Sequence, residues 1–143
     1  METNSMQQIT TPWAGASGLV TGLILTEIHH DVWNGYLRLS MGMPTQADVP
    51  PSVIYQLQFE YVLGYRVLEG DEAIMANDDH INPTASQVYL VTPSRFLMRF
   101  HQQSQGTYLD EDIQHYRVES WDYCVDILAA RPPLIKRKIG VAQ

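Results

Sequence analysis

Alternating apolar and polar residues predict β-strands over much of the chain. The clearest case is residues 53–63, where apolar side chains occupy every second position and mostly polar ones lie between them. A period of two with one apolar side is typical of an antiparallel strand with one buried face. Shorter runs predict strands at 65–68, 87–91 and 113–119, and the lysine-containing tail at 134–141 is expected to add an edge strand.

Residues 24–43 predict a β-hairpin, because Asn34-Gly35 lies between two β-rich runs. A turn of only these two residues sets the opposed pairs, which are Trp33–Tyr36, Asp31–Arg38 and His29–Ser40. The opposite face is expected to be the core side, and it carries Ile28, His30, Val32, Leu37, Leu39 and Met41.

Two helices are expected in the C-terminal half. The first is predicted over 92–106, with Thr92 as its N-cap and Pro93 as its first helical residue. The second is predicted from a Ser120 cap to the stop at 131–133. Their apolar faces are Phe96, Leu97 and Phe100 in the first, and Trp121, Val125 and Leu128 in the second. The predicted class is α+β, a twisted, mainly antiparallel sheet of five to seven strands with two C-terminal helices packed on one face.

The 143 residues fit one domain, which we expect to span 19–143 after a flexible N-terminal arm at 1–18 that contains a Gly-Ala-Ser-Gly stretch. The single cysteine, Cys124, excludes an intramolecular disulfide. The N-terminus has neither the basic residues nor the apolar run of a secretory signal, and no apolar stretch approaches the length of a membrane span. We therefore expect a cytoplasmic protein without membrane contact.

Charge is divided unevenly along the chain. All 16 acidic residues and five of the nine basic ones lie before residue 131, which gives residues 1–130 a net charge of −11. The tail carries +4, from Arg131, Lys136, Arg137 and Lys138. A body this acidic repels phosphate backbones, so nucleic-acid binding is not expected, and a cationic partner suits it better.

Metal and cysteine chemistry are not predicted. Adjacent strand residues point to opposite faces, so His29 and His30 cannot share an ion, and residues 78–80 lack the spacing of a calcium loop. Cys124 lies between two nearby aspartates, which disfavour a thiolate. We expect no cofactor and no metal.

Two alternatives to partner binding remain open. His101 and His115 could act as the acid–base pair of a small metal-independent hydrolase or ribonuclease, although the acidic body opposes phosphate binding. The Trp33–Tyr36 edge could form the interface of a structural homo-oligomer such as a homodimer.

The stretch "LQFEYVLGYRVLEGDE" is similar to an F-E-x-V-x-x-Y-R-x-x-E strand, matched here by Phe59, Glu60, Val62, Tyr65, Arg66 and Glu69. Downstream come a strand, a Phe-rich helix, an acidic loop, an "HY" strand and a final helix ending at Pro-Pro, in an order that resembles small uncharacterised bacterial proteins of toxin-immunity type over about residues 53–135. The resemblance implies an immunity function but assigns no functional residue.

We therefore expect a cytosolic immunity-type binding protein that neutralises a cationic partner toxin by covering its active surface. The acids of the 69–80 loop and of 110–112, with two tyrosines as aromatic anchors, are the expected contacts. The predicted partner-binding residues are Glu69, Asp71, Glu72, Asp78, Asp79, Tyr108, Asp110, Glu111, Asp112 and Tyr116.

Overall fold

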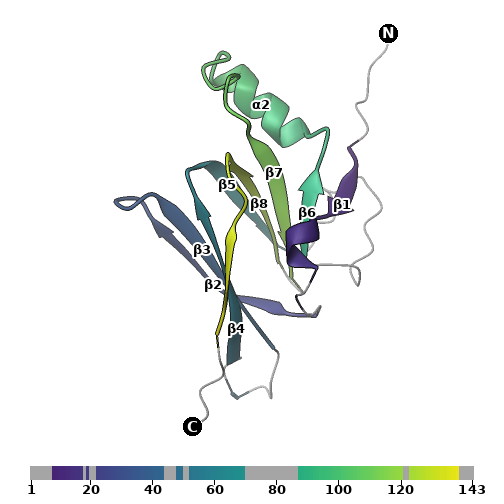
Figure 1. Ribbon diagram of the computed structural model, residues 1–143, viewed down its shortest axis with the longest axis vertical. Helices are drawn as coiled ribbons and strands as arrows, with labels where there is room; N and C mark the ends of the chain where they lie inside the picture. Colours follow the sequence, from purple (N-terminus) through teal and green to yellow (C-terminus); the bar gives the residue numbers. More distant parts are fainter. Residues whose placement is uncertain are drawn as a thin grey trace.

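The computed structural model describes residues 8–17, 19, 22–43, 48–49, 52–69, 87–120 and 123–138. These residues form two antiparallel β-sheets, a short 3-10 helix and one α-helix (Figure 1). Mainly antiparallel strands with a helix were predicted, but the nine described strands exceed the predicted five to seven and form two sheets. The elements are β1 (Thr10–Pro12), η1 (Ala14–Ala16), β2 (Ile24–Asp31), β3 (Tyr36–Met43), β4 (Ser52–Glu60), β5 (Val62–Glu69), β6 (Val88–Val91), α2 (Arg95–Gln103), β7 (Gln114–Glu119), β8 (Tyr123–Ala129) and β9 (Leu134–Arg137).

The two sheets face each other across one apolar core. The five-stranded sheet has the order β1-β6-β7-β8-β5, and the four-stranded sheet has the order β2-β3-β4-β9. Side chains from both inner faces form a single buried cluster, as the predicted alternation requires. Its main members are Leu37, Leu39, Met41, Tyr55, Leu57 and Phe59 from the four-stranded sheet and Val88, Tyr116, Val118, Val125, Ile127 and Ala129 from the five-stranded sheet.

The turn between β2 and β3 holds four residues, 32–35, instead of the two predicted. Asp31 pairs with Tyr36 and His29 pairs with Arg38. Because the register differs by two residues, each strand side chain keeps its predicted face. Of the predicted core face, the structure buries Leu37, Leu39 and Met41, half-buries Ile28, and exposes His30 and Val32.

Residues 123–129 form strand β8, so the second predicted helix is wrong. The strand lies between β7 and β5, and six of its seven residues are buried. A strand covered on both faces requires apolar residues at consecutive positions, and such a run contains helical spacings by chance. Trp121 and Asp122 lie outside the described residues.

The described part of the predicted N-terminal arm is built into the fold. Thr10–Pro12 pair with β6 at the edge of the five-stranded sheet. The Gln8 side chain accepts a hydrogen bond from the backbone N–H of Arg95 at 2.7 Å. Trp13 meets Tyr116 edge to face, with ring centroids 5.9 Å apart. Residues 8–17 therefore close an edge of the sheet, contrary to the prediction of a loose arm.

Helix α2 lies at one end of the five-stranded sheet, next to β7 (Figure 1). Its N-cap is Ser94, whose Oγ accepts the N–H of Leu97 at 2.9 Å, so the predicted cap at Thr92 is two residues too early. Strand β9 pairs with β4 and forms the predicted edge strand. Within the described residues, no helix is long and apolar enough to cross a membrane.

Candidate functional site

The acidic segment 110–112 lies on a compact turn that follows α2. Gly106 takes a φ of 75°, a conformation that favours glycine, and turns the backbone away from the axis of α2. Backbone N–H groups of Leu109 and Glu111 then donate to the carbonyls of Gly106 and Tyr108, at 3.2 and 3.0 Å. Both aspartates of the segment are exposed. The acids predicted as a partner surface are therefore held on a hydrogen-bonded turn.

Tyr61 connects this turn to two other loops. Its hydroxyl donates to Glu111 Oε2 at 3.2 Å, and its backbone N–H donates to the carbonyl of Gly35 at 3.4 Å. The hydrogen bond to Glu111 raises the pKa of Tyr61, because it favours the neutral phenol. Tyr61 thus joins the β4–β5 connection, the acidic turn and the β2–β3 turn at one end of the sandwich.

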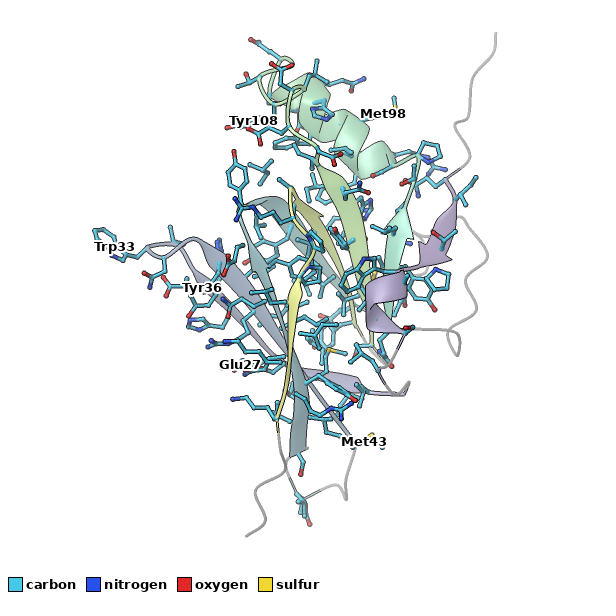
Figure 2. The ribbon with its side chains drawn as sticks, in the orientation of Figure 1. Glu27, Trp33, Tyr36, Met43, Met98 and Tyr108 are labelled. Carbon is cyan, nitrogen blue, oxygen red and sulfur yellow. The ribbon has the colours of Figure 1, made fainter. Side chains whose placement is uncertain are left out.

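The β2–β3 turn presents a large apolar side chain to solvent. The Asp31 carboxylate accepts hydrogen bonds from the backbone and side-chain amides of Asn34, at 2.9 and 2.8 Å, and these bonds lower the pKa of Asp31. Between these residues, Val32 is 79% exposed and Trp33 is 93% exposed. Figure 2 shows Trp33 projecting from the tip of the hairpin. The turn is fixed, whereas its two apolar side chains contact little of the protein.

We call this end of the molecule the acidic rim and define it as residues 32–35, Tyr61 and residues 106–112. It combines exposed carboxylates with exposed apolar groups, since Leu109 is 64% and Tyr61 44% exposed. Interfaces commonly bury such an aromatic and apolar centre within a polar border. The acidic rim is therefore the most interface-like surface among the described residues.

Of the two predicted aromatic anchors, only Tyr108 lies on this rim. It is half-buried and packs against Phe100, with ring centroids 5.4 Å apart. Tyr116 is 3% exposed and belongs to the core between the sheets. The prediction of Tyr116 as a surface anchor is wrong, because β7 turns that residue toward the four-stranded sheet.

The structure separates the predicted acids that it describes. Glu69 is exposed at the far end of β5, opposite Tyr123. The strand runs seven residue steps, about 23 Å at ~3.3 Å per residue, from the rim end at Val62 to Glu69. The other predicted contacts, Asp71, Glu72, Asp78 and Asp79, lie outside the described residues.

Sequence reasoning missed Trp33 and Tyr61 as rim residues. A two-residue turn placed Trp33 in the strand, and the alternation through 53–63 gave Tyr61 an inner position. Instead, Tyr61 takes a φ of 57° and breaks the strand between β4 and β5. For Trp33, the sequence did offer a signal, because this tryptophan directly precedes Asn34-Gly35, a dipeptide typical of hairpin turns. The predicted Trp33–Tyr36 edge is also altered, because Tyr36 is half-buried while Trp33 stands clear on the turn.

A buried charged network occupies the outer face of the five-stranded sheet. Asp126 is completely buried and accepts from His115 Nε2 at 2.7 Å, Arg117 Nε at 2.8 Å and Arg66 Nε at 2.9 Å. Burial raises the pKa of this carboxyl, but the hydrogen bonds and charges of His115 and Arg117 outweigh burial and hold the pKa far below the usual range. Asp126 is therefore an ionised link between β5, β7 and β8.

His115 extends this network to α2. Since Nε2 donates to an ionised carboxylate, Nδ1 accepts, and the hydroxyl of Ser94 donates to it at 2.6 Å. The resulting Ser94–His115–Asp126 chain has the order of a nucleophile, base and orienting acid. However, Ser94 is 5% exposed and its Oγ is already engaged by two groups. We interpret the chain as the anchor that fixes α2 and, through α2, the acidic rim.

The predicted histidine pair does not share this chain. Both ring nitrogens of His115 are engaged, and His115 is 1% exposed. His101 lies on α2 beside Phe100, and its buried Nδ1 has no hydrogen-bond partner. Proton transfer between the two would require His115 to give up a partner. Cys124 is also buried, and burial raises the pKa of its thiol, as its predicted inertness requires.

No cluster of three or more potential metal ligands occurs within the described ranges. Comparisons with protein-family models, with curated proteins and with solved structures each returned no match. The chemistry of the acidic rim is therefore what indicates a function for this protein.

Proposed function

We propose that this chain is a cytosolic immunity-type binding protein that neutralises a cationic partner toxin by covering its active surface with the acidic rim. The observation that carries the proposal is the joining of three loops by Tyr61, which holds the turn of the exposed Asp110 and Asp112 at the same end of the sandwich as the 93% exposed Trp33. Toxins that act on nucleic acid need cationic clefts, and an acidic surface can occupy such a cleft.

Each component of the rim suits a separate part of binding. The carboxylates at 110–112, on a body of net charge −11, would accelerate the encounter with a cationic protein. Trp33 supplies a large apolar group that a partner pocket can bury, and tryptophan is frequent among residues that dominate binding energy. Hydrogen bonds within both turns fix these groups before binding, which reduces the entropy lost on association.

Three of the four basic residues of the tail, Lys136, Arg137 and Lys138, lie along β4 away from this charge, whereas Arg131 follows the end of β8 that pairs with Val62 at the rim end. Residues 134–137 pair with β4, and Arg137 bonds to the Tyr55 hydroxyl at 3.3 Å instead of to a carboxylate. This basic segment follows β4 away from the acidic rim (Figure 1). Lys136, Arg137 and Lys138 therefore leave the acids of the rim available to a partner.

The proposal is tested with the product of the gene adjacent to its own, by stopped-flow association at several salt concentrations. The double variant Asp110→Asn, Asp112→Asn is expected to slow association at low salt by about 10-fold and to flatten its salt dependence. The matched control is Glu27→Gln, Asp48→Asn, which removes the same charge from exposed positions outside the rim. The control should change the rate by less than about 2-fold.

Trp33→Ala tests the apolar component and is expected to raise the dissociation rate by about 10-fold or more, with Met98→Ala on the exposed face of α2 as its control. Equal slowing by the two charge variants would show that total charge matters and the rim does not. If the adjacent product neither binds this protein nor has a toxicity that it suppresses, the proposed function is wrong.

A further inference from the structure

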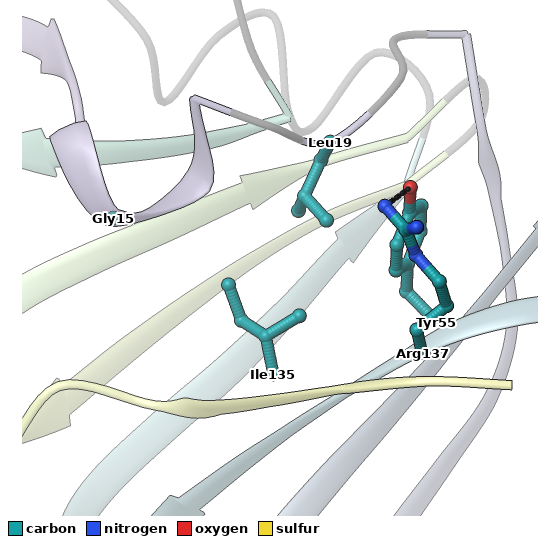
Figure 3. Close-up of a pocket in the computed structure, with 5 residues that line it drawn as sticks. All are labelled: Gly15, Leu19, Tyr55, Ile135 and Arg137. Atoms are coloured by element: carbon teal, nitrogen blue, oxygen red, sulfur yellow. Dashed lines mark hydrogen bonds between the residues drawn. The ribbon is translucent and has the colours of Figure 1, made fainter.

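An open cavity lies between the η1 segment and the edge of the four-stranded sheet formed by β9, away from the acidic rim. It has a volume of about 210 Å³ and is lined by Gly15, Leu19, Tyr55, Ile135 and Arg137 (Figure 3). At ~30 Å³ for each molecule of liquid water, this space corresponds to about seven water molecules. It therefore suits a compact organic molecule and is too small for a folded segment of another protein.

One end of the cavity carries two polar groups that converge. Arg137 Nη2 donates to the Tyr55 hydroxyl at 3.3 Å, and the guanidinium carbon lies 5.5 Å from the Tyr55 ring centroid. A phenol that accepts this bond still has its own proton to donate, and a guanidinium has further N–H groups. Among the described residues, no carboxylate pairs with Arg137. The pair thus offers several donors and a positive charge to an anion.

The remaining walls are apolar. Leu19 and Ile135 face the space from opposite sides in Figure 3, and both pack against the main core cluster. Gly15 cannot carry a side chain here, because a Cβ would lie 2.3 Å from the Trp13 ring. An anion bound at Arg137 would therefore place its other end against hydrocarbon.

We propose that this cavity binds a small monocarboxylate with a short apolar body, such as a medium-chain or aromatic acid. The carboxylate accepts from Arg137 and from the Tyr55 hydroxyl, in the charge-assisted geometry that guanidinium groups provide. The apolar body fills the space beside Leu19 and Ile135. Lys136 and Lys138 flank Arg137 in sequence and make this edge attractive to anions, in contrast to the acidic rim. The site is independent of the proposed partner binding.

Hexanoate, with about eight non-hydrogen atoms, is the probe, and hexan-1-ol is its neutral counterpart. Binding to the full chain is followed by amide chemical shifts of ¹⁵N-labelled protein. Hexanoate is expected to produce saturable shifts at Leu19, Ile135 and Arg137 with a Kd on the order of 1 mM, whereas hexan-1-ol binds at least about 10-fold more weakly. Absence of saturable shifts with hexanoate up to its solubility limit would overturn the proposal.

Arg137→Gln is expected to weaken hexanoate binding by about 10-fold or more, and Tyr55→Phe by about 3-fold to 10-fold. Lys136→Gln is the matched control, because it removes the same charge from the adjacent position, which points to the other face of β9. The control should remain within about 2-fold of the parent protein. Equal loss in Arg137→Gln and Lys136→Gln would indicate attraction by total charge and would refute a defined site.

Leu19→Trp provides a variant that fills the cavity without changing its charge. It should abolish the hexanoate shifts while circular dichroism and the unfolding midpoint show that the fold is kept. If the filled variant binds hexanoate as well as the parent protein, the ligand lies elsewhere and the proposal is wrong.

Discussion

His115 Nε2 lies 2.7 Å from Asp126 Oδ1, on the face of the five-stranded sheet that points away from the apolar core. The two residues come from neighbouring strands and are both almost completely inaccessible to water. Two arginines share the same carboxylate. A buried charge cluster therefore links the strands where the sequence predicted an amphipathic helix with Val125 and Leu128 on its apolar face.

Asp126→Asn is expected to lower the free energy of unfolding by about 3–5 kcal/mol, because Arg117 would remain charged and buried without its counter-ion. Equilibrium unfolding in urea measures the change. Asp112→Asn, on the exposed acidic turn, is the matched control and should lie within about 0.5 kcal/mol of the parent protein. A loss below about 1 kcal/mol for Asp126→Asn would mean that the network does not stabilise the fold.

Stability should fall as the pH decreases below about 6.5, the ordinary value for histidine. Burial lowers the pKa of His115, the two arginines act in the same direction, and Asp126 opposes them. Between the two pKa values, His115 is protonated in the unfolded chain and neutral in the folded protein. Its contribution to the free energy of unfolding is therefore complete above pH ~6.5 and is lost as the pH falls toward the lower pKa of the folded state. Asp126 adds a further loss below about pH 3.9 for the same reason.

Two measurements check the pH dependence. Nuclear magnetic resonance of the His115 ring should give a midpoint below about 6.5. Urea unfolding at a series of pH values should show a slope near pH 6 that is reduced in His115→Gln. A ring midpoint above about 6.5 would reverse the expected sign.

Glu111→Gln should lower the pKa of Tyr61 toward its ordinary value. In the parent protein the carboxylate accepts the phenol proton at 3.2 Å and so disfavours ionisation, and a neutral amide removes the charge from this pair. Ultraviolet titration of the parent, of Glu111→Gln and of Tyr61→Phe identifies the signal. The control variant Asp110→Asn should leave the raised pKa of Tyr61 unchanged. If the Tyr61 titration is also unchanged in Glu111→Gln, the hydrogen bond between Tyr61 and Glu111 does not join these loops.

Gly42→Ala should destabilise the four-stranded sheet by about 1–3 kcal/mol, because a Cβ there would lie 2.3 Å from the carbonyl oxygen of Ser52. The residue stands at a register irregularity between β3 and β4, where the backbones approach closely. Gly64→Ala is the control in another strand, since its nearest neighbour would be 3.9 Å away. Thermal unfolding of both variants should show a loss only for Gly42→Ala.

Local sequence patterns predicted the strands that have one buried face and one more exposed face. The alternation in β4 follows from one buried face, and the predicted inward residues Leu37, Leu39 and Met41 of β3 and Tyr55, Leu57 and Phe59 of β4 are buried in the structure. The pattern failed at β8, because a strand covered on both sides loses its period of two. It also failed at the β2–β3 turn, where a four-residue loop keeps the same alternation as a two-residue one.

The strand-rich class, the acidic body and the basic tail can be predicted from the sequence, because periodicity and charge are properties of the chain alone. Only the tertiary structure decided which charges meet. Asp126 is one acid among 16 in the sequence, and its two arginines come from β5 and β7. Gly35, Tyr61 and Glu111 likewise meet because three loops lie at the same end of the sandwich. Contacts between strands depend on pairing order, which no local pattern encodes.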